Sequence, residues 1–83
     1  MPRSIHSDQY KRLTTMLLAT RKSAGLTQQD VADRLGKPQS YVAKIEGNER
    51  RIDLVEFVAL ANALGIEPNT MFANALSAIS KSK

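Results

Sequence analysis

The chain has 83 residues, no cysteine and a net charge of +4. This length fits one small helical domain and is too short for a catalytic pocket enclosed by two layers of structure. The lack of cysteine excludes disulfides, thiolate metal sites and thiol nucleophiles. No apolar run reaches the roughly 18 residues of a membrane span, and no signal peptide is recognisable. We therefore expect a cytoplasmic protein without membrane contact or cofactor.

The charge is unevenly distributed along the chain. Residues 1–51 contain ten Lys or Arg against five Asp or Glu, whereas residues 52–80 contain three acids and no base. A polyanion would be attracted to the first half, and the second half is left to pack against a partner or face solvent. A basic excess of this size also occurs on ordinary solvated surfaces, so charge alone does not identify the partner.

The first seven residues show no apolar period and are predicted to be a flexible arm. A first helix is expected over about 8–23, where apolar side chains recur at three- and four-residue steps. The clearest of these are Tyr10, Leu13 and Leu17. Gly25 is expected to end this helix.

Two short helices are predicted next, with a tight turn between them. Thr27 is a good N-cap, and Asp30 three residues later completes a capping-box arrangement. The second helix should end at Leu35, because Gly36 can adopt the positive φ that closes a helix. Pro38 suits the first turn of a third helix, which should run to residue 46.

The spacing of small and apolar residues in this stretch is typical of a helix-turn-helix. Ala32 is small enough for the third helix to cross closely, and Val42 fills the angle between the two helices. The remaining residues expected on the buried side are Val31, Leu35 and Ile45. A polar stripe of the third helix then faces outward, where it could reach base edges in a DNA major groove. The sequence therefore predicts a DNA-binding protein.

The second half predicts two further helices. Asp53 should cap a fourth helix over about 54–64, and Gly65 should end it. Its core-facing side chains are expected to be Phe57, Leu60, Ala61 and Leu64. A fifth helix should follow over about 70–79, opened by Pro68 or Asn69.

These elements give an all-α fold of five helices, with no strand pattern and no repeat. We expect the helix-turn-helix DNA-binding domain to span residues 8–80. The arm 1–7 should precede it, and a C-terminal tail, 81–83, should follow it.

The motifs GLTQ, LG, KIEG and ALG are spaced through residues 17–66, LLATRKSAGLTQQDVADRLGKPQSYVAKIEGNERRIDLVEFVALANALGI. In this spacing the chain resembles the helix-turn-helix domain of the Cro and phage-repressor (XRE) family of regulators. The resemblance implies a lambda-repressor-like fold and a transcription regulator, such as a repressor, whose third helix lies in the major groove. It also implies a homodimer on a two-fold symmetric operator of double-stranded DNA.

The third helix supplies the candidates for base reading. Gln39 begins it, and its amide can donate to and accept from adenine at once. Ser40 can bond several bases, Ala43 could contact a thymine methyl, and Lys44 could reach guanine or a phosphate. Tyr41 is less clear, because its ring could pack on the scaffold while its hydroxyl contacts a phosphate. The candidates are thus Gln39, Ser40, Tyr41, Ala43 and Lys44.

Candidates for phosphate binding surround this helix. Gln28 lies at the start of the second helix, whose unpaired N–H groups suit a phosphate, and this position often touches the DNA backbone in the family. Lys37 precedes the reading helix, and Asn48, Arg50 and Arg51 follow it.

One departure from the family pattern lies in the turn. The family often has an apolar residue and then Ser or Thr after the turn glycine, whereas Lys37 and Pro38 stand here. The hydroxyl cap is therefore missing, and Pro38 offsets the loss by fixing φ. The tilt of the third helix stays open, and so does the choice of base-reading side chain.

The fifth helix carries an apolar stripe that a bundle this small cannot cover completely. Phe72 is expected to finish the monomer core, and Leu76 and Ile79 are open between core and dimer contact. The predicted dimer interface consists of Met71, Ala75, Leu76 and Ile79.

Two charge pairs are expected. The resemblance implies that Arg21 and Glu46 form a partly buried structural ion pair. Arg34 is expected to pair with Asp30 one helical turn earlier, at the surface, where such a pair contributes only about 0.3 to 0.5 kcal/mol.

Other functions are less well supported by the residues. An enzyme is not expected, since the only histidine, His6, lies in the predicted arm and no metal-ligand cluster or phosphate loop occurs. No small-molecule ligand is predicted. The alternative reading is an antitoxin whose main contact is a partner protein. A phage repressor, a restriction-modification controller and a chromosomal regulator would look much alike.

Overall fold

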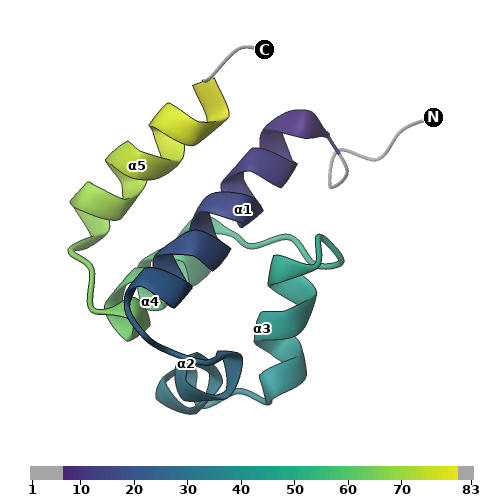
Figure 1. Ribbon diagram of the computed structural model, residues 1–83, viewed down its shortest axis with the longest axis vertical. Coiled ribbons are helices and arrows are strands. Elements are labelled where there is room, and N and C mark those ends of the chain that lie inside the picture. Colours follow the sequence, from purple (N-terminus) through teal and green to yellow (C-terminus); the bar gives the residue numbers. More distant parts are fainter. Residues whose placement is uncertain (1–6, 81–83) are drawn as a thin grey trace.

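The structure is a computed structural model, and it describes residues 7–80. Five helices and no strand occur in this part of the chain, which confirms the all-α prediction (Figure 1). The helices are α1 (Asp8–Ser23), α2 (Gln28–Leu35), α3 (Gln39–Glu46), α4 (Leu54–Leu64) and α5 (Pro68–Ser80). Of the predicted arm and tail, residues 1–6 and 81–83 lie outside the described residues, as does His6.

Local capping fixes where the helices begin. In α2 the Thr27 hydroxyl accepts from the Asp30 amide at 3.0 Å, and the Asp30 carboxylate accepts from the Thr27 amide at 2.9 Å. The same reciprocal arrangement joins Asp53 and Glu56 at the start of α4. Each box satisfies two backbone N–H groups that have no partner inside the helix. Ser7, which was assigned to the arm, instead caps α1 by accepting from the Tyr10 amide at 3.1 Å.

Two proline positions differ slightly from the prediction. Pro38 is the N-cap of α3 with an extended backbone, ψ 156°, so the helix begins one residue later, at Gln39. The fifth helix begins at Pro68, two residues before the expected start. There the Glu67 carboxylate accepts from the Thr70 amide at 3.1 Å, a side-chain cap that the sequence pattern did not reveal.

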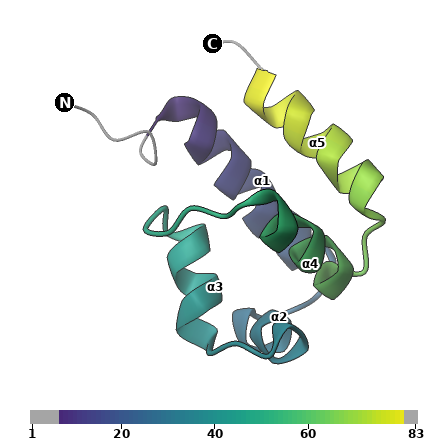
Figure 2. The same ribbon diagram turned by 180° about the vertical axis from the view of Figure 1, so that it is seen from behind.

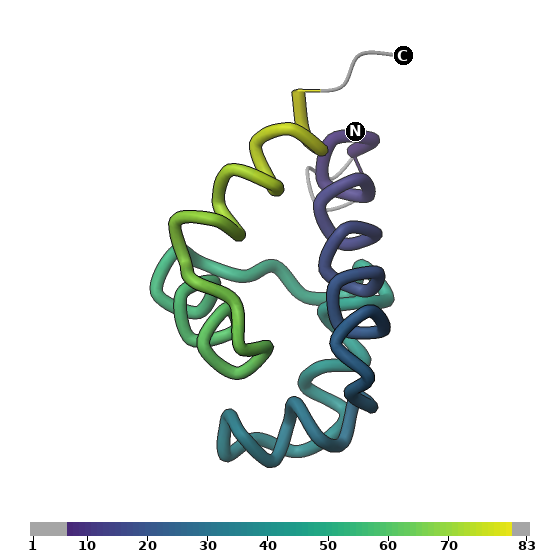
Figure 3. The backbone as a smooth tube through the Cα atoms, turned by 60° about the vertical axis from the view of Figure 1, so that its left-hand side comes forward, coloured from purple at the N-terminus to yellow at the C-terminus, as the bar shows by residue number. Residues whose placement is uncertain are grey.

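The helices form two groups. The longest, α1, lies antiparallel beside α5, so that both ends of the described chain lie at the same end of the molecule (Figures 1 and 3). The short helices α2 and α3 form the opposite end, and α4 packs against both α2 and α5 (Figure 2). The Arg12 guanidinium fastens α1 to the last turn of α5, donating to the carbonyls of Ala78 at 3.1 Å and Ile79 at 3.3 Å.

The core draws on all five helices. The predicted core residues of α4 are buried, and so are Val31, Ala32, Val42 and Ile45 of the helix-turn-helix. Leu35 is only partly buried and packs against the edge of this cluster. These contacts bury apolar side chains of two helices that are each only eight residues long. Isolated helices of that length are not stable in water, so this burial stabilises them.

The rotation of α5 about its axis was predicted incorrectly. Met71 is fully buried and Ala75 is 3% exposed, so both belong to the monomer core and are not available to a second copy. Phe72 is 53% exposed instead of finishing the core, and its ring is roughly perpendicular to the Phe57 ring, with centroids 6.4 Å apart. Leu76 is also 53% exposed, while Ile79 is partly buried. The apolar stripe of α5 was predicted, but which of its side chains face the core was predicted wrongly.

None of the described helices is long and apolar enough to cross a membrane. Within residues 7–80 no group of three or more acidic or histidine side chains could hold a metal ion.

Candidate nucleic-acid interface

The turn between α2 and α3 is held by backbone geometry. Gly36 adopts the left-handed conformation with φ 68°, and the Lys37 amide donates back to the Ala32 carbonyl at 2.9 Å. Ala32 has no exposed surface and Val42 is 2% exposed, which is the close crossing predicted for them. As a result α3 leans against the body on one side only and keeps its other side open to solvent.

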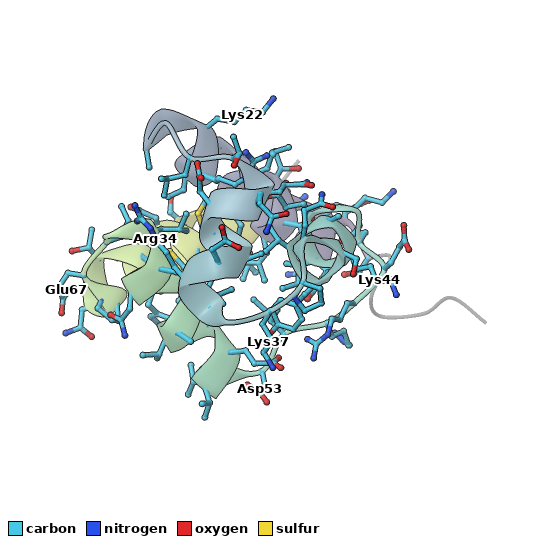
Figure 4. All side chains as sticks on the ribbon, turned by 90° about the horizontal axis from the view of Figure 1, so that it is seen from below. Lys22, Arg34, Lys37, Lys44, Asp53 and Glu67 are labelled. Carbon is cyan, nitrogen blue, oxygen red and sulfur yellow. The ribbon has the colours of Figure 1, made fainter. Side chains whose placement is uncertain are left out.

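The open side of α3 carries most of the predicted base-reading residues. Gln39, Ser40 and Lys44 are exposed, and Ala43 is partly exposed between them. Viewed from below, Lys44 extends from the outer side of α3, while the acidic Glu67 lies at the opposite edge of the molecule (Figure 4). This side therefore offers an amide, a hydroxyl and an ammonium group, the groups that hydrogen-bond to base edges and phosphates.

Tyr41 lies on a different side of α3. Its ring is partly buried against the core, and the guanidinium of Arg50 lies over it with 4.5 Å between the guanidinium carbon and the ring centroid. The Lys37 ammonium approaches the ring at 5.3 Å. Burial and the nearby negative charge of Glu56 raise the pKa of Tyr41 above its ordinary value. The ring therefore packs on the scaffold, and the phosphate contact of the Tyr41 hydroxyl stays a prediction.

Arg50 joins the loop after α3 to the start of α4. Its Nη1 and Nη2 atoms donate to the two carboxylate oxygens of Glu56 at 3.2 and 3.0 Å. This pair, together with the hydrogen bond from the Asp53 amide, lowers the pKa of Glu56 to about 2. The hydrogen bonds that Arg50 donates to Glu56 in turn raise the pKa of Arg50. A phosphate at Arg50 would have to compete with this carboxylate.

Arg21 and Glu46 form the ion pair that the resemblance implied. Arg21 Nε donates to Glu46 Oε2 at 2.7 Å and Nη2 donates to Oε1 at 3.0 Å, while Nη1 donates to the Leu26 carbonyl at 2.8 Å. The side chains are only 11% and 9% exposed. The hydrogen bonds to Glu46 raise the pKa of Arg21, so the guanidinium stays charged. The pair ties the end of α3 to α1.

Gln28 and Gln39 are in direct contact, which the sequence did not reveal. The Gln39 amide nitrogen donates to Gln28 Oε1, and Gln28 Nε2 donates to Glu46 Oε1 at 2.9 Å. The first residue of α2 and the first residue of α3 thus meet side by side. Predicting this contact requires the crossing angle of the two helices, which sequence spacing alone does not supply.

The other phosphate candidates differ in how accessible they are. Lys37 and Arg51 are exposed, and the Arg51 guanidinium lies 5.2 Å from the centroid of the Tyr10 ring. Asn48 is partly buried in a left-handed conformation, φ 66°, and its Oδ1 accepts from the Thr14 hydroxyl at 3.1 Å. Asn48 therefore serves the loop geometry with at least one of its amide atoms.

The predicted surface pair between Arg34 and Asp30 is wrong. Arg34 Nη1 donates to the carbonyl of Ala63 in α4 at 2.8 Å. The Asp30 carboxylate is used in the capping box, and the hydrogen bond from the Thr27 amide lowers its pKa. The Thr27 amide competes with Arg34 for the Asp30 carboxylate. The amide prevails because a backbone N–H at the helix start is close and fixed in position.

One basic residue near the interface was missed. Lys22, at the exposed end of α1, lines an open groove together with Thr27, Gln28 and Gln39. Its side chain extends from the edge of the molecule (Figure 4). The groove thus combines the start of α2, the start of α3 and an ammonium group. In the sequence, Lys22 is explained equally well as a favourable positive charge at the C-terminal end of a helix. Its position beside the start of α2 could therefore not be predicted.

Comparisons with known proteins agree with this geometry. The profile of the helix-turn-helix family matches residues 17–70. The structure superimposes with a TM-score of 0.79 on an XRE-family like protein from Pseudomonas syringae pv. tomato str. DC3000, at 39% identity over 89% of this chain and 90% of that one.

The chain belongs to the XRE family of helix-turn-helix regulators. Other solved structures are also similar. One is the restriction-modification controller protein C.AhdI from Aeromonas hydrophila, with 36% identity over 74% of this chain and 92% of that one, and a TM-score of 0.66. Another is the controller protein C.Esp1396I, crystallised as a tetramer with its natural 35 base-pair operator. It has a TM-score of 0.81 over 92% of this chain and all of that one, but at 21% identity it supports the fold only. No curated protein matches the sequence.

Proposed function

We propose that this XRE-family protein binds a two-fold symmetric DNA operator as a homodimer, with α3 in the major groove, and thereby regulates transcription. The observation that carries the proposal is the exposed first turn of α3, where Gln39 and Ser40 project from a helix buried on its other side. A major groove admits one α-helix, and side chains in the first turn are those that reach base edges.

Contacts to bases and to phosphates are assigned to different residues. Gln39, Ser40, Ala43 and Lys44 form the base-reading set, and Tyr41 supports it from the scaffold. The phosphate contacts flank α3 on both sides. On one side are Gln28 and Lys22 along the open groove, and on the other are Lys37, Arg51 and, with smaller contributions, Asn48 and Arg50.

The homodimer is assigned to the apolar side of α4 and α5. Leu54 and Val55 are 68% and 78% exposed, and Val58, Phe72 and Leu76 are also exposed. Leu54 and Phe72 border an apolar groove of about 200 Å³ that Ile79 also lines. A cluster of large apolar side chains in water favours association. Because α5 packs on α1 and α4, a partner on this side leaves α3 accessible (Figures 1 and 2).

Membership of the XRE family of helix-turn-helix regulators supports the DNA partner. The fold is shared with C.Esp1396I, which was crystallised with its operator. Among the regulator classes we favour a restriction-modification controller, because the chain is 36% identical to the controller protein C.AhdI. A repressor of another kind would use the same contacts.

The division between base and phosphate contacts is testable with two variants. Selection from random duplexes identifies the operator, and affinities are then measured at two salt concentrations. Gln39→Ala should lose about 1–3 kcal/mol of discrimination at one base pair. Arg51→Ala should weaken binding to all sequences alike and reduce the salt slope by about 1. Equal losses on operator and random DNA for both variants would refute the assignment, and selection without any preferred sequence would refute the function.

A further inference from the structure

We propose that Glu56 lowers the affinity of this protein for DNA, because its carboxylate occupies the Arg50 guanidinium in the way that a phosphate would. DNA must then displace Glu56 before a phosphate can bind Arg50. This inference rests on the proposed DNA-binding function and on the position of Arg50 beside α3. It makes Glu56 a residue that sets the strength of DNA binding and acts through Arg50.

Arg50 lies beside α3, over the ring of Tyr41. The guanidinium carbon is 4.5 Å from the ring centroid, and the Lys37 ammonium is 5.3 Å from the same centroid. Lys37 precedes α3 in the chain and Arg50 follows it, so the ring brings together two cations that the sequence separates. Two cations at the side of the helix that is proposed to enter the major groove suit backbone phosphates.

Glu56 holds the guanidinium in the geometry of a bound phosphate. Arg50 Nη1 and Nη2 donate to its two carboxylate oxygens at 3.2 and 3.0 Å, and arginine uses the same bidentate arrangement for phosphate. Nη1 also donates to the Arg51 carbonyl at 2.9 Å. Both terminal nitrogens of Arg50 are therefore engaged within the protein.

Glu56 is fixed in this position and keeps its charge. Its Oε1 atom accepts from the Asp53 amide at 3.0 Å, as part of the capping box of α4. The hydrogen bonds from Arg50 and from the Asp53 amide lower the pKa of Glu56 to about 2, so protonation does not release Arg50 near neutral pH. A competing anion can release it, and DNA presents phosphates at high density.

This competition should be visible in the salt dependence of DNA binding. A side-chain cation that binds a phosphate releases a counterion from the DNA, which steepens the salt slope by about 0.9. When Arg50 exchanges Glu56 for a phosphate, the unpaired carboxylate takes up a cation, and the two effects cancel. We therefore expect Arg50 to add almost nothing to the salt slope as long as Glu56 is charged.

The test compares Glu56→Gln with Glu67→Gln as its matched control. Each substitution removes one negative charge from a side chain that accepts a backbone N–H at the start of a helix, and glutamine keeps an acceptor for that bond. Glu67 lies at the edge of the molecule opposite Lys44 of α3 (Figure 4). The affinity of each variant for a fluorescent duplex of random sequence is measured at several salt concentrations, below the midpoint of thermal unfolding.

Glu56→Gln should bind the duplex about two- to fivefold more tightly than Glu67→Gln, which is the strength of a partly exposed ion pair. Its salt slope should be steeper by about 0.9. Equal affinities and equal slopes in the two folded variants overturn the proposal. If the unaltered protein binds no duplex, the DNA-binding function itself is refuted, and the inference with it.

Arg50→Met separates this competition from direct repulsion between Glu56 and DNA. By itself this substitution should leave the salt slope almost unchanged, because Glu56 already cancels the contribution of Arg50. Adding Glu56→Gln to Arg50→Met should then raise the affinity no more than Glu67→Gln does. Direct repulsion would instead give the full gain without the guanidinium, and that result would overturn the proposal.

Discussion

Gly36 controls the direction in which α3 leaves α2, and it does so through its backbone alone. Its φ of 68° lies in the left-handed region, and a Cβ placed there would meet no atom within 4 Å. Any cost of a side chain at this position is therefore conformational and not steric. The role of Gly36 was predictable from sequence, since a glycine that follows a periodic helix and precedes another is typical of this turn.

We expect Gly36→Ala to lower the free energy of unfolding by about 1–2 kcal/mol, the cost of the left-handed conformation for a residue with a Cβ. Gly36→Asn should lose less, because asparagine tolerates this region better. Urea denaturation of the two variants measures the difference. Equal losses for alanine and asparagine would show that something other than backbone conformation determines the cost.

Side-chain partners were harder to predict than backbone roles. The contact between Gln28 and Gln39 and the bond from Arg34 to the Ala63 carbonyl both join different helices. Each depends on how two helices cross, and spacing within one helix contains no such information. The ion pair of Arg21 and Glu46 was foreseen only because the family resemblance implied it.

The helix boundaries were predicted well for a local reason. Caps and left-handed glycines act within about four residues, so Thr27, Asp53 and Gly65 could be recognised in the sequence alone. The rotation of α5 was not local. Whether Met71 or Phe72 faces inward depends on where α1 and α4 present their grooves, and the apolar stripe of α5 is wide enough to fit either way.

The anchoring of α3 to α1 should dominate the stability of the helix-turn-helix. Glu46→Ala leaves the Arg21 guanidinium buried and unpaired, and we expect a loss of about 3–5 kcal/mol. Glu56→Ala removes a more exposed pair with Arg50 and should cost less. Thermal and urea unfolding compare the two. An unchanged stability in Glu46→Ala would refute the structural role of the pair.

The start of α4 should respond to acid. The pKa of Glu56 is lowered to about 2, because Arg50 and the Asp53 amide stabilise its charged form. A lowered pKa in the folded state contributes stability above the unfolded value of about 4.5, and the contribution is lost as pH falls toward 2. The stability difference between the protein and Glu56→Gln should therefore be present at pH 6 and shrink steadily below pH 4.5. A difference that does not depend on pH would contradict the assignment.

The proposed DNA-binding surface and the proposed dimer surface come from different halves of the sequence. Ten of its twelve Lys and Arg residues lie in residues 1–51, which contain α2 and α3, and its exposed large apolar side chains lie on α4 and α5. A DNA-binding dimer needs one surface for a polyanion and another for its partner, and this division follows the order of the sequence. The uneven charge can be read from the sequence, whereas the apolar side chains that remain exposed could be identified only from the structure.

Leu76→Glu should weaken dimer formation, since it places a charge where a half-exposed leucine would be buried. We expect dimerisation to weaken by about 1.5–3 kcal/mol, the burial energy of one such side chain, or roughly tenfold or more. The matched control is Ser77→Glu on the neighbouring exposed position. Sedimentation at micromolar concentration measures both. A dimer that survives Leu76→Glu but not Ser77→Glu would place the interface elsewhere on α5.

Arg12 connects the two ends of the described chain, because it reaches from the second turn of α1 to the last carbonyls of α5. The helix proposed to contact a second copy, α5, is therefore held by α1. The same helix α1 also anchors α3 through the ion pair of Arg21 with Glu46. Melting of α5 and melting of the DNA-facing end would then occur together as one cooperative transition. Association on α5 would stabilise every part of each protomer, so heat resistance would depend on protein concentration.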